Sequence, residues 1–248
     1  MYPEGAEQPT WKIDPEFLYD TFTFVRVRYS VDSTHGYGHD PVYRWRTDAP
    51  DSDINFSWRL SQMTSMAVHP DGDFIDLIDP RLYSYPFIYI VEPGRLHFHE
   101  EEVVALRRYL LNGGFLMFDD FWGEREGRNL FDEMRRVFPD RESQELDLKH
   151  PIFHCVFDLK EKPQVPNVSL GIRSEFNGGI TWERSDARNP DYRAIYDDKG
   201  RMMVMICHNT DNGDGWEREG ESEYYFHEFS EKKAYPLGIN IIFYAMTH

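Results

Sequence analysis

The stretch YPFIYIVEPGRLHFHEEEVVALRRYLLNGGFLMFDD, residues 85–120, decides the fold class. It opens with an apolar run over 85–94, which predicts a short strand that ends in a turn. Residues 97–114 predict a helix, because three glutamates favour its amino-terminal end and an Asn-Gly pair is typical of its left-handed carboxyl end. A second apolar run over 115–120 predicts a buried strand that ends in two carboxylates. This spacing indicates a parallel βαβ unit with a right-handed connection.

The flanking sequence adds elements of the same kind. Alternating apolar residues predict a strand, Gly- and Pro-rich segments predict loops, and helical spacing of apolar residues predicts helices. A long loop in a compact domain is often functional. The expected elements are a strand over 21–30, a long loop over 31–53, a helix over 54–68 capped by Ser52 or Asp53, and a helix over 126–138 that Pro139 ends.

After residue 150 the pattern becomes less regular. Shorter strands are expected over 150–159, 178–186 and 192–207, with a hairpin turn at 197–200, and a helix follows Pro236. Residues 1–20 are rich in Pro and Glu and predict an extended arm. No linker composition separates the rest, so residues 21–248 are expected to form a single α/β domain with an irregular, β-rich carboxyl-terminal half.

Two long phrases, residues 85–124 and AYPLGINIIFYAMTH at 234–248, resemble a bacterial family of unknown function among the class I glutamine amidotransferase-like domains. The resemblance covers about residues 20–248. It implies a flavodoxin-like three-layer sandwich with a mostly parallel sheet. It does not imply amidotransferase activity, because a fold does not fix a function. Similar proteins often carry an export signal, so the resemblance implies an exported or periplasmic protein in a mature form.

Composition limits the classes of partner. A net charge of −17 over 248 residues repels phosphate backbones and anionic membranes, so nucleic acid is not expected as a partner. A small molecule or a protein is expected instead, and the oligomeric state stays open. No apolar run approaches the roughly 20 residues that a membrane-spanning helix needs. The first residues show no signal-peptide pattern, so the chain is expected to be soluble, and cytoplasmic unless a signal was removed.

Cys207 and His208 lie at the end of an apolar run and invite comparison with a nucleophile and its base. Amidotransferases place the cysteine in a turn flanked by glycine between a strand and a helix, whereas no small residue flanks Cys207. Neighbouring residues of a strand point to opposite faces, so this pair is not expected to form a dyad. Cys207 is interpreted as a buried core residue, and cysteine-dependent amidotransferase activity is not expected.

The segment TDNGDGWEREGE, residues 210–221, resembles a calcium-binding loop in which Thr210 replaces the first ligand. No suitable helices are expected around it, so a solvated turn is the alternative interpretation. Asp211 and Asp214 remain candidates for a less regular metal site. A divalent cation is therefore possible, but the sequence specifies no cofactor.

Asp119 and Asp120 carry the strongest functional prediction. Ligands of parallel α/β sheets bind beyond the carboxyl ends of the strands, and these two carboxylates lie at such an end. Two like charges there would raise one pKa or hold a metal ion. The alternative is structural: Asp120 caps the next helix and Asp119 points outward.

The same rule predicts the rest of one crevice at the strand ends. Its expected members, besides Asp119 and Asp120, are Arg28, Tyr29, Glu92, Trp122 and His208. A surface network of ion pairs is the alternative interpretation of these charges.

Three function classes follow. The leading hypothesis is an amidotransferase-like domain that binds a ligand or partner. The second is a hydrolase, with or without a metal ion, in which Asp119 or Asp120 acts as base or ligand and His208 as acid or ligand. The third is an assembly protein whose aromatic loops form an interface.

Overall fold

The structure, a computed structural model, describes residues 8–17, 20–31 and 41–248. Seven strands form one sheet in the spatial order β3-β1-β4-β6-β9-β8-β7. The first five strands of this order are parallel, and β8 and β7 add an antiparallel edge. The strands are β1 (Val25–Arg28), β3 (Asp73–Asp76), β4 (Phe87–Val91), β6 (Phe115–Asp119), β7 (Gln144–Glu145), β8 (Asp191–Tyr196) and β9 (Met202–His208).

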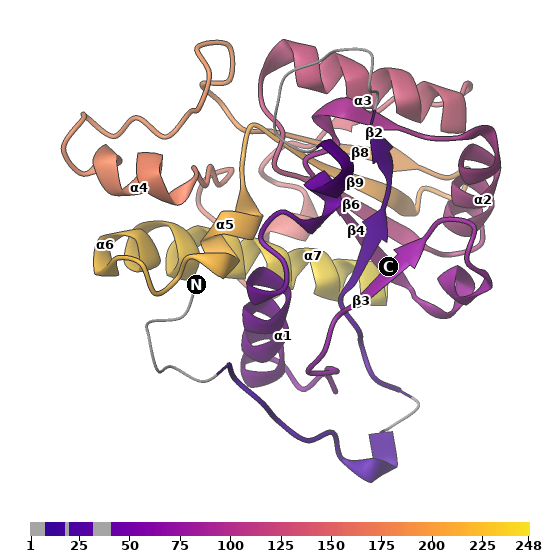
Figure 1. Ribbon diagram of the computed structural model, residues 1–248, viewed down its shortest axis with the longest axis horizontal. Coiled ribbons are helices and arrows are strands. Elements are labelled where there is room, and N and C mark those ends of the chain that lie inside the picture. The colour runs from indigo at the N-terminus through magenta and orange to yellow at the C-terminus, as the bar shows by residue number, and fades with distance from the viewer. Residues whose placement is uncertain (1–7, 18–19, 32–40) are drawn as a thin grey trace.

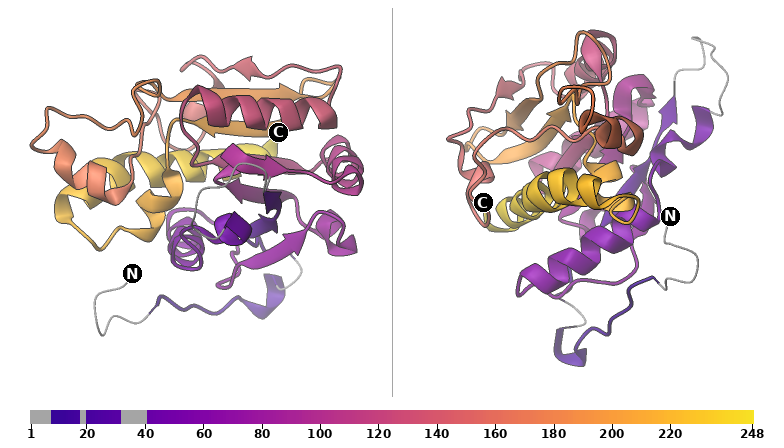
Figure 2. Two further views of the ribbon diagram at one scale, coloured as in Figure 1. Left: turned by 45° about the horizontal axis from the view of Figure 1, so that its top comes forward. Right: turned by 90° about the vertical axis from the view of Figure 1, so that its left-hand side faces the viewer.

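Helices cover both faces of this sheet (Figure 1). One face packs against α2 (Glu100–Leu111) and α3 (Gly123–Val137). The other packs against α1 (Asp51–Met63), α5 (Asn212–Glu217), the π-helix η6 (Phe226–Ala234) and α7 (Tyr235–Thr247). Two further views show the sheet between these layers (Figure 2). The α/β class and the mostly parallel sheet are therefore confirmed.

Alternation along the strands explains this layering. In β4, Phe87 and Tyr89 belong to the core beneath α1 and α7, whereas Ile88 and Ile90 belong to the core beneath α2 and α3. All four are fully buried. A strand with helices on both faces has no polar side, which is why this segment reads as an unbroken apolar run.

Shorter elements connect the main ones. Helices α4 (Val168–Ser174) and α6 (Glu223–Tyr225) lie in the carboxyl-terminal half, and β2 (Ser30–Val31) pairs with β5 (Leu96–His97) in a small antiparallel sheet. The 3-10 turns are η1 (Pro15–Phe17), η2 (Pro41–Arg46), η3 (Pro80–Ser84), η4 (Pro93–Arg95) and η5 (Pro151–Phe153). Within the described ranges, no helix is long and apolar enough to cross a membrane.

Several predicted elements differ from the structure. No strand forms over 178–186, and over 150–159 only the 3-10 turn η5 forms, so the expectation of a β-rich second half is wrong there. These segments cover the edge of the core, where loops and turns suffice. The segment 210–221 is not a solvated turn, since it contains the buried helix α5.

The amino-terminal segments lie partly outside the described residues. Of the predicted arm over 1–20, residues 1–7 and 18–19 lie outside; Trp11 lies within, and its indole donates to the carbonyl of Val68 at 2.8 Å. Of the predicted loop over 31–53, residues 32–40 lie outside, and the remainder contains η2 and the first turn of α1.

Candidate functional site

Acidic side chains that follow four parallel strands meet in one cavity. Asp48 follows β1 by way of η2, Glu92 follows β4 directly, Asp120 follows β6, and Asp211 follows β9. The cavity has a volume of about 350 Å³. It lies where the chain turns from β1 outward to β3 and returns to β4 on the other side, the position at which open α/β sheets bind ligands.

Carboxylates dominate the lining of this cavity, which is called the acidic crevice below. Seven of them line it, and three arginines accompany them. The carboxylates are Asp48, Glu92, Asp120, Glu126, Glu183, Asp211 and Asp214; the arginines are Arg44, Arg184 and Arg218.

The backbone at the acidic crevice is unusual. Asp48, Glu92, Asp120 and Asn209 have φ of 66°, 48°, 55° and 61°, and they are the non-glycine residues with positive φ in the described part of the chain. Three of the four line the crevice. Side chains other than glycine avoid this conformation, and such residues cluster at functional sites. The fourth, Asn209, accepts a hydrogen bond from the backbone N–H of Gly123 at 2.9 Å and so fixes the start of α3.

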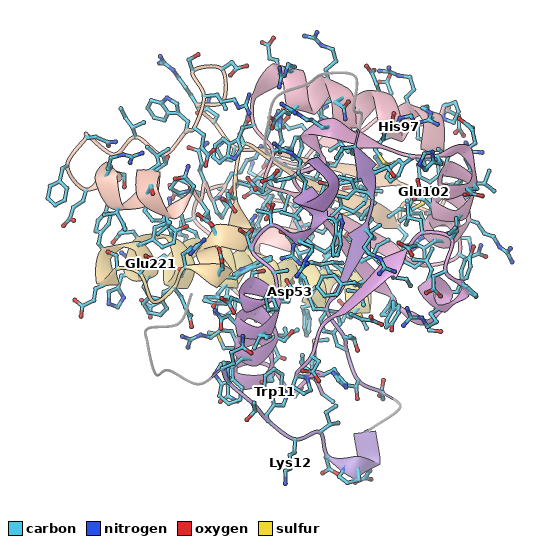
Figure 3. All side chains as sticks on the ribbon, in the orientation of Figure 1. Trp11, Lys12, Asp53, His97, Glu102 and Glu221 are labelled. Atoms are coloured by element: carbon cyan, nitrogen blue, oxygen red, sulfur yellow. The ribbon has the colours of Figure 1, made fainter. Side chains whose placement is uncertain are left out.

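Arg26, fully buried in β1, holds the segment that carries Asp48. Its Nε donates to both oxygens of Asp53 at 2.8 Å, Nη2 donates to Ser52 Oγ at 2.7 Å, and Nη1 donates to the carbonyl of Thr47 at 2.6 Å. Burial alone would lower the pKa of Arg26, but Asp53 outweighs burial and raises it. Asp53 therefore does not cap α1 as predicted; it lies at the amino-terminal end of that helix as the partner of a core arginine (Figure 3).

Helix α5 brings the carboxylates of Asp211 and Asp214 to the crevice. Asp211 Oδ1 accepts from the backbone N–H of Asp214 at 2.8 Å, and Asp214 Oδ2 accepts from the N–H of Val168 at 2.6 Å. Asp48 packs closely on this helix, because a Cβ added at Gly213 would lie 2.2 Å from Asp48 Oδ2. A glycine at that position allows the two elements to meet.

Asp119 lies beneath the start of helix α5. It is fully buried and accepts hydrogen bonds from Tyr89 Oη at 3.0 Å, from Asn212 N at 3.0 Å and Nδ2 at 2.7 Å, and from Gly213 N at 3.1 Å. Burial raises the pKa of Asp119 to about 6, although these donors oppose the rise. Its role is to fix the first turn of α5, and it does not line the crevice.

The carboxylates of the crevice lie close together. One oxygen each of Asp48, Asp120 and Asp211 lie within 4.8 Å of one another. Burial, followed by the charges of neighbouring carboxylates, raises the pKa of each of the three well above its ordinary value. Burial likewise raises the pKa of Asp214 to about 6. The protein alone therefore disfavours full ionisation of this group.

The nearby arginines do not neutralise these three aspartates. Arg44 pairs with Glu92, and Arg184 pairs with Glu126. Across the described residues, no ion pair reaches Asp48, Asp120 or Asp211. The acidic groups of this crevice could therefore hold a metal ion.

Five of the residues predicted from the sequence line the crevice: Glu92, Asp120, Trp122, Asp211 and Asp214. The indole of Trp122 donates to Asp120 Oδ1 at 3.1 Å. The crevice residues that sequence reasoning missed are Asp48, Glu126, Glu183, Thr47, Asn167 and the three arginines. Of these, Asp48 lies in the long loop that was predicted to be functional, whereas no sequence pattern distinguishes the others.

Arg28, Tyr29 and His208 do not line the crevice, so the prediction that they belong to it is wrong. Arg28 forms a two-pronged pair with Asp76 of neighbouring β3, at 2.9 and 2.8 Å. Tyr29 Oη donates to the carbonyl of Glu92 at 2.9 Å and supports the crevice from outside.

His208 is only 8% exposed and stacks on Phe121 with ring centroids 4.5 Å apart. Its Nε2 lies 3.0 Å from the carbonyl oxygen of Gly123. Its neighbour Cys207 is fully buried in the core on the other face of the sheet, and burial raises the pKa of this thiol well above its ordinary value. The two side chains therefore lie on opposite faces, as the strand period predicts.

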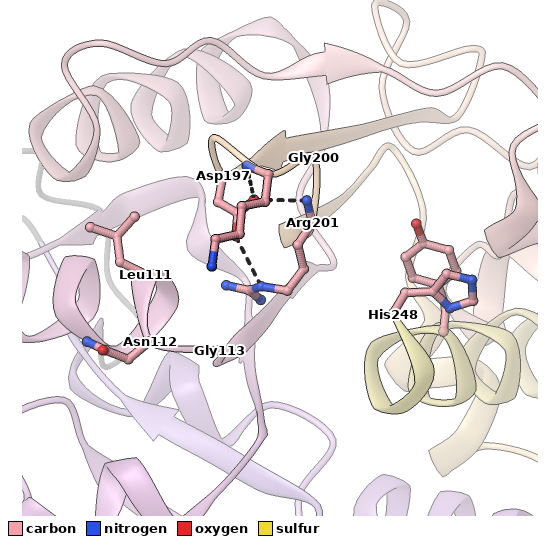
Figure 4. A pocket seen from close by; sticks show the side chains of 9 residues that line it. Leu111, Asn112, Gly113, Asp197, Gly200, Arg201 and His248 are labelled. Carbon is pink, nitrogen blue, oxygen red and sulfur yellow. Dashed lines mark hydrogen bonds and ion pairs between the residues drawn. The ribbon is translucent and has the colours of Figure 1, made fainter.

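A larger hollow of about 600 Å³ lies at the opposite end of the parallel strands, beside the starts of β6 and β9 (Figure 4). Arg201 is its main charged group, but Nε of Arg201 lies 3.3 Å from Asp197 Oδ2, and its other nitrogens donate to the carbonyls of Leu110 and Gly114. These partners satisfy Arg201, and this hollow does not gather carboxylates as the acidic crevice does.

The fold and the site together define an α/β protein with a carboxylate-lined crevice at the ends of its parallel strands. The chain belongs to the family described as "Domain of unknown function (DUF4159)", whose model matches residues 23–246. Among curated proteins, none matches this sequence.

Proposed function

We propose that this chain is a ligand-binding domain whose acidic crevice binds a divalent cation through Asp48, Asp120 and Asp211. The observation that carries the proposal is the convergence of these three carboxylates within 4.8 Å, without an ion-pair partner in the described residues. Asp48 comes from the connection between η2 and α1, and Asp120 and Asp211 come from the ends of β6 and β9. The buried oxygen Asp48 Oδ2 accepts no hydrogen bond there either. A buried charge without a partner is costly, and a cation would compensate it.

Carboxylate oxygens favour hard cations such as Mg²⁺, Ca²⁺ and Mn²⁺. Three protein ligands leave coordination positions open for water or a ligand, and the cavity of about 350 Å³ has room for a small molecule beside the ion. The bound ligand would therefore meet the cation at the centre and Trp122, Arg44 and Arg184 around it.

The proposal is tested by titrating chelator-treated protein with Mn²⁺, Mg²⁺ and Ca²⁺ in a calorimeter. The wild type is expected to bind, and Asp120→Asn is expected to lose at least tenfold in affinity. The exposed Asp140 supplies a matched control, since Asp140→Asn removes a carboxylate away from the crevice. Binding that is equally strong in all three proteins would refute the proposed site.

We also propose that the domain is flavodoxin-like and amidotransferase-like over residues 21–248, of bacterial origin and exported, and without cysteine chemistry. The support is the resemblance of residues 85–124 and 234–248, together with the position of Cys207 inside a strand. A nucleophilic cysteine needs an accessible thiolate, whereas burial favours the neutral thiol here.

Metal-assisted hydrolysis is a second candidate, favoured by Asp214. Its pKa of about 6 suits a general base near neutral pH, and it lines the same cavity. The test compares hydrolysis of p-nitrophenyl acetate and p-nitrophenyl phosphate with Mn²⁺, for the wild type and Asp214→Asn. A wild-type rate no higher than that of Mn²⁺ alone, with both substrates, would remove this candidate.

A further inference from the structure

Asp48 belongs to two groups of carboxylates, not one. Besides its group with Asp120 and Asp211, an oxygen of Asp48 lies within 4.8 Å of one oxygen each of Asp214 and Glu217, and these also lie within that distance of each other. Asp214 and Glu217 are three residues apart on α5, so they project from the same side of the helix. Asp48 thus lies between two groups of possible ligands.

The second group is well enclosed. Asp214 is 8% exposed, and the side chain of Glu217 is 13% exposed. Arg218 is the nearby cation: its Nε lies 2.7 Å from Glu217 Oε2 but 3.9 Å from Asp214 Oδ1. One arginine therefore faces three carboxylates, which leaves the group with excess negative charge.

Unused hydrogen-bonding capacity points to a ligand independently of the charge count. Asp48 Oδ2 is buried and accepts no hydrogen bond within the described chain. Asp211 is only 4% exposed and lines the cavity, yet the described donors reach only its Oδ1. A buried carboxylate oxygen normally accepts a hydrogen bond or binds a cation, so Asp48 Oδ2 is placed as a metal ligand would be.

We propose that the acidic crevice, together with Glu217 beside it, holds a pair of divalent cations bridged by the carboxylate of Asp48. One cation is bound by Asp48, Asp120 and Asp211, and the other by Asp48, Asp214 and Glu217. This inference rests on the proposed function, because it adds a second ion to the same crevice. Five carboxylates matched by two divalent ions nearly balance in charge, and paired metal sites commonly place their ions about 3.5–4 Å apart.

The experiment counts Mn²⁺ ions bound to the full chain by equilibrium dialysis and records the EPR spectrum of the bound Mn²⁺. The wild type is expected to bind two ions and to show the spectrum of a magnetically coupled pair. Asp120→Asn and Glu217→Gln remove ligands from different groups, so each is expected to bind one ion with an uncoupled spectrum. Asp140→Asn is expected to keep two coupled ions.

The possible failures are distinguishable. In one outcome the wild type binds a single uncoupled ion, Asp120→Asn abolishes this binding and Glu217→Gln leaves it unchanged. That outcome refutes the second ion and leaves the single-cation proposal standing, with Arg218 compensating the charge of Asp214 and Glu217 instead. If the wild type binds no Mn²⁺, both proposals fall. Circular dichroism of each variant establishes that it is folded.

Discussion

Replacing Asp214 by asparagine is expected to remove one contribution to the pH dependence of the free energy of unfolding of the cation-free protein. Burial, reinforced by the charge of Glu217, raises the pKa of Asp214 from 3.8 to about 6 in the folded state. Since one pKa unit corresponds to about 1.4 kcal/mol, this rise corresponds to about 3 kcal/mol of differential stability.

The sign follows from proton linkage. The folded state holds the proton of Asp214 more tightly than the unfolded state does, so the stabilising contribution is complete below about pH 4 and is lost as the pH rises through about 6. Asparagine does not ionise and lacks this contribution. The free energy of unfolding of the wild type relative to Asp214→Asn should therefore fall by about 2.4 kcal/mol between pH 4 and pH 7.

The assay is urea unfolding followed by tryptophan fluorescence, in chelator, at pH 4 and pH 7. Asp140→Asn serves as the control, because it removes an exposed carboxylate away from the crevice. Adding Mn²⁺ at pH 7 should stabilise the wild type more than Asp214→Asn. A difference between wild type and Asp214→Asn that is the same at both pH values would refute the reasoning that burial holds the proton on Asp214.

Three further outcomes are expected. Arg26→Met leaves Asp53 as a buried carboxylate without its partner, so the free energy of unfolding should fall by about 3–5 kcal/mol in urea titrations. A loss below about 1 kcal/mol would contradict the role of the Arg26–Asp53 pair in holding this segment. Gly213→Ala places a Cβ 2.2 Å from Asp48 Oδ2. Because such overpacking costs about 1–3 kcal/mol, the affinity for Mn²⁺ measured by calorimetry should fall about tenfold or more. An unchanged affinity would show that Asp48 is not a ligand. Iodoacetamide at neutral pH should modify Cys207 only after unfolding, as mass spectrometry of the labelled peptide would show, and rapid labelling of the native protein would contradict its assignment to the core.

Much of the fold follows from local patterns. The strands at 87–91 and 115–119 and the helix between them are where the periodicity predicts them, because burial on both faces leaves a continuous apolar run. Residues 150–186 were harder to predict, since their apolar residues cover the core edge without forming strands. An apolar run alone does not distinguish these cases, because side chains of turns also fill the core.

The candidate site was only partly predictable for a more specific reason. Asp119 and Asp120 are adjacent, and the rule that ligands bind beyond the carboxyl ends of parallel strands selects both. The positive φ of Asp120 turns its side chain into the crevice, whereas Asp119 lies beneath the crevice. Arg26 and Arg28 are two residues apart on one strand, and the sequence favoured Arg28 as the functional arginine. Arg26 is the buried one because Asp53, distant in sequence, compensates its charge, and such pairs have no local pattern.

The ligands of the proposed cation pair have a consequence for how the protein is made. They extend from residue 48 to residue 217, so a chain emerging from the ribosome contains the first ligand long before the last. Helix α5 and strand β9 must both be synthesised and docked before the carboxylates meet. Cation binding would then mark completed folding, and a truncated or stalled chain would not capture the ion.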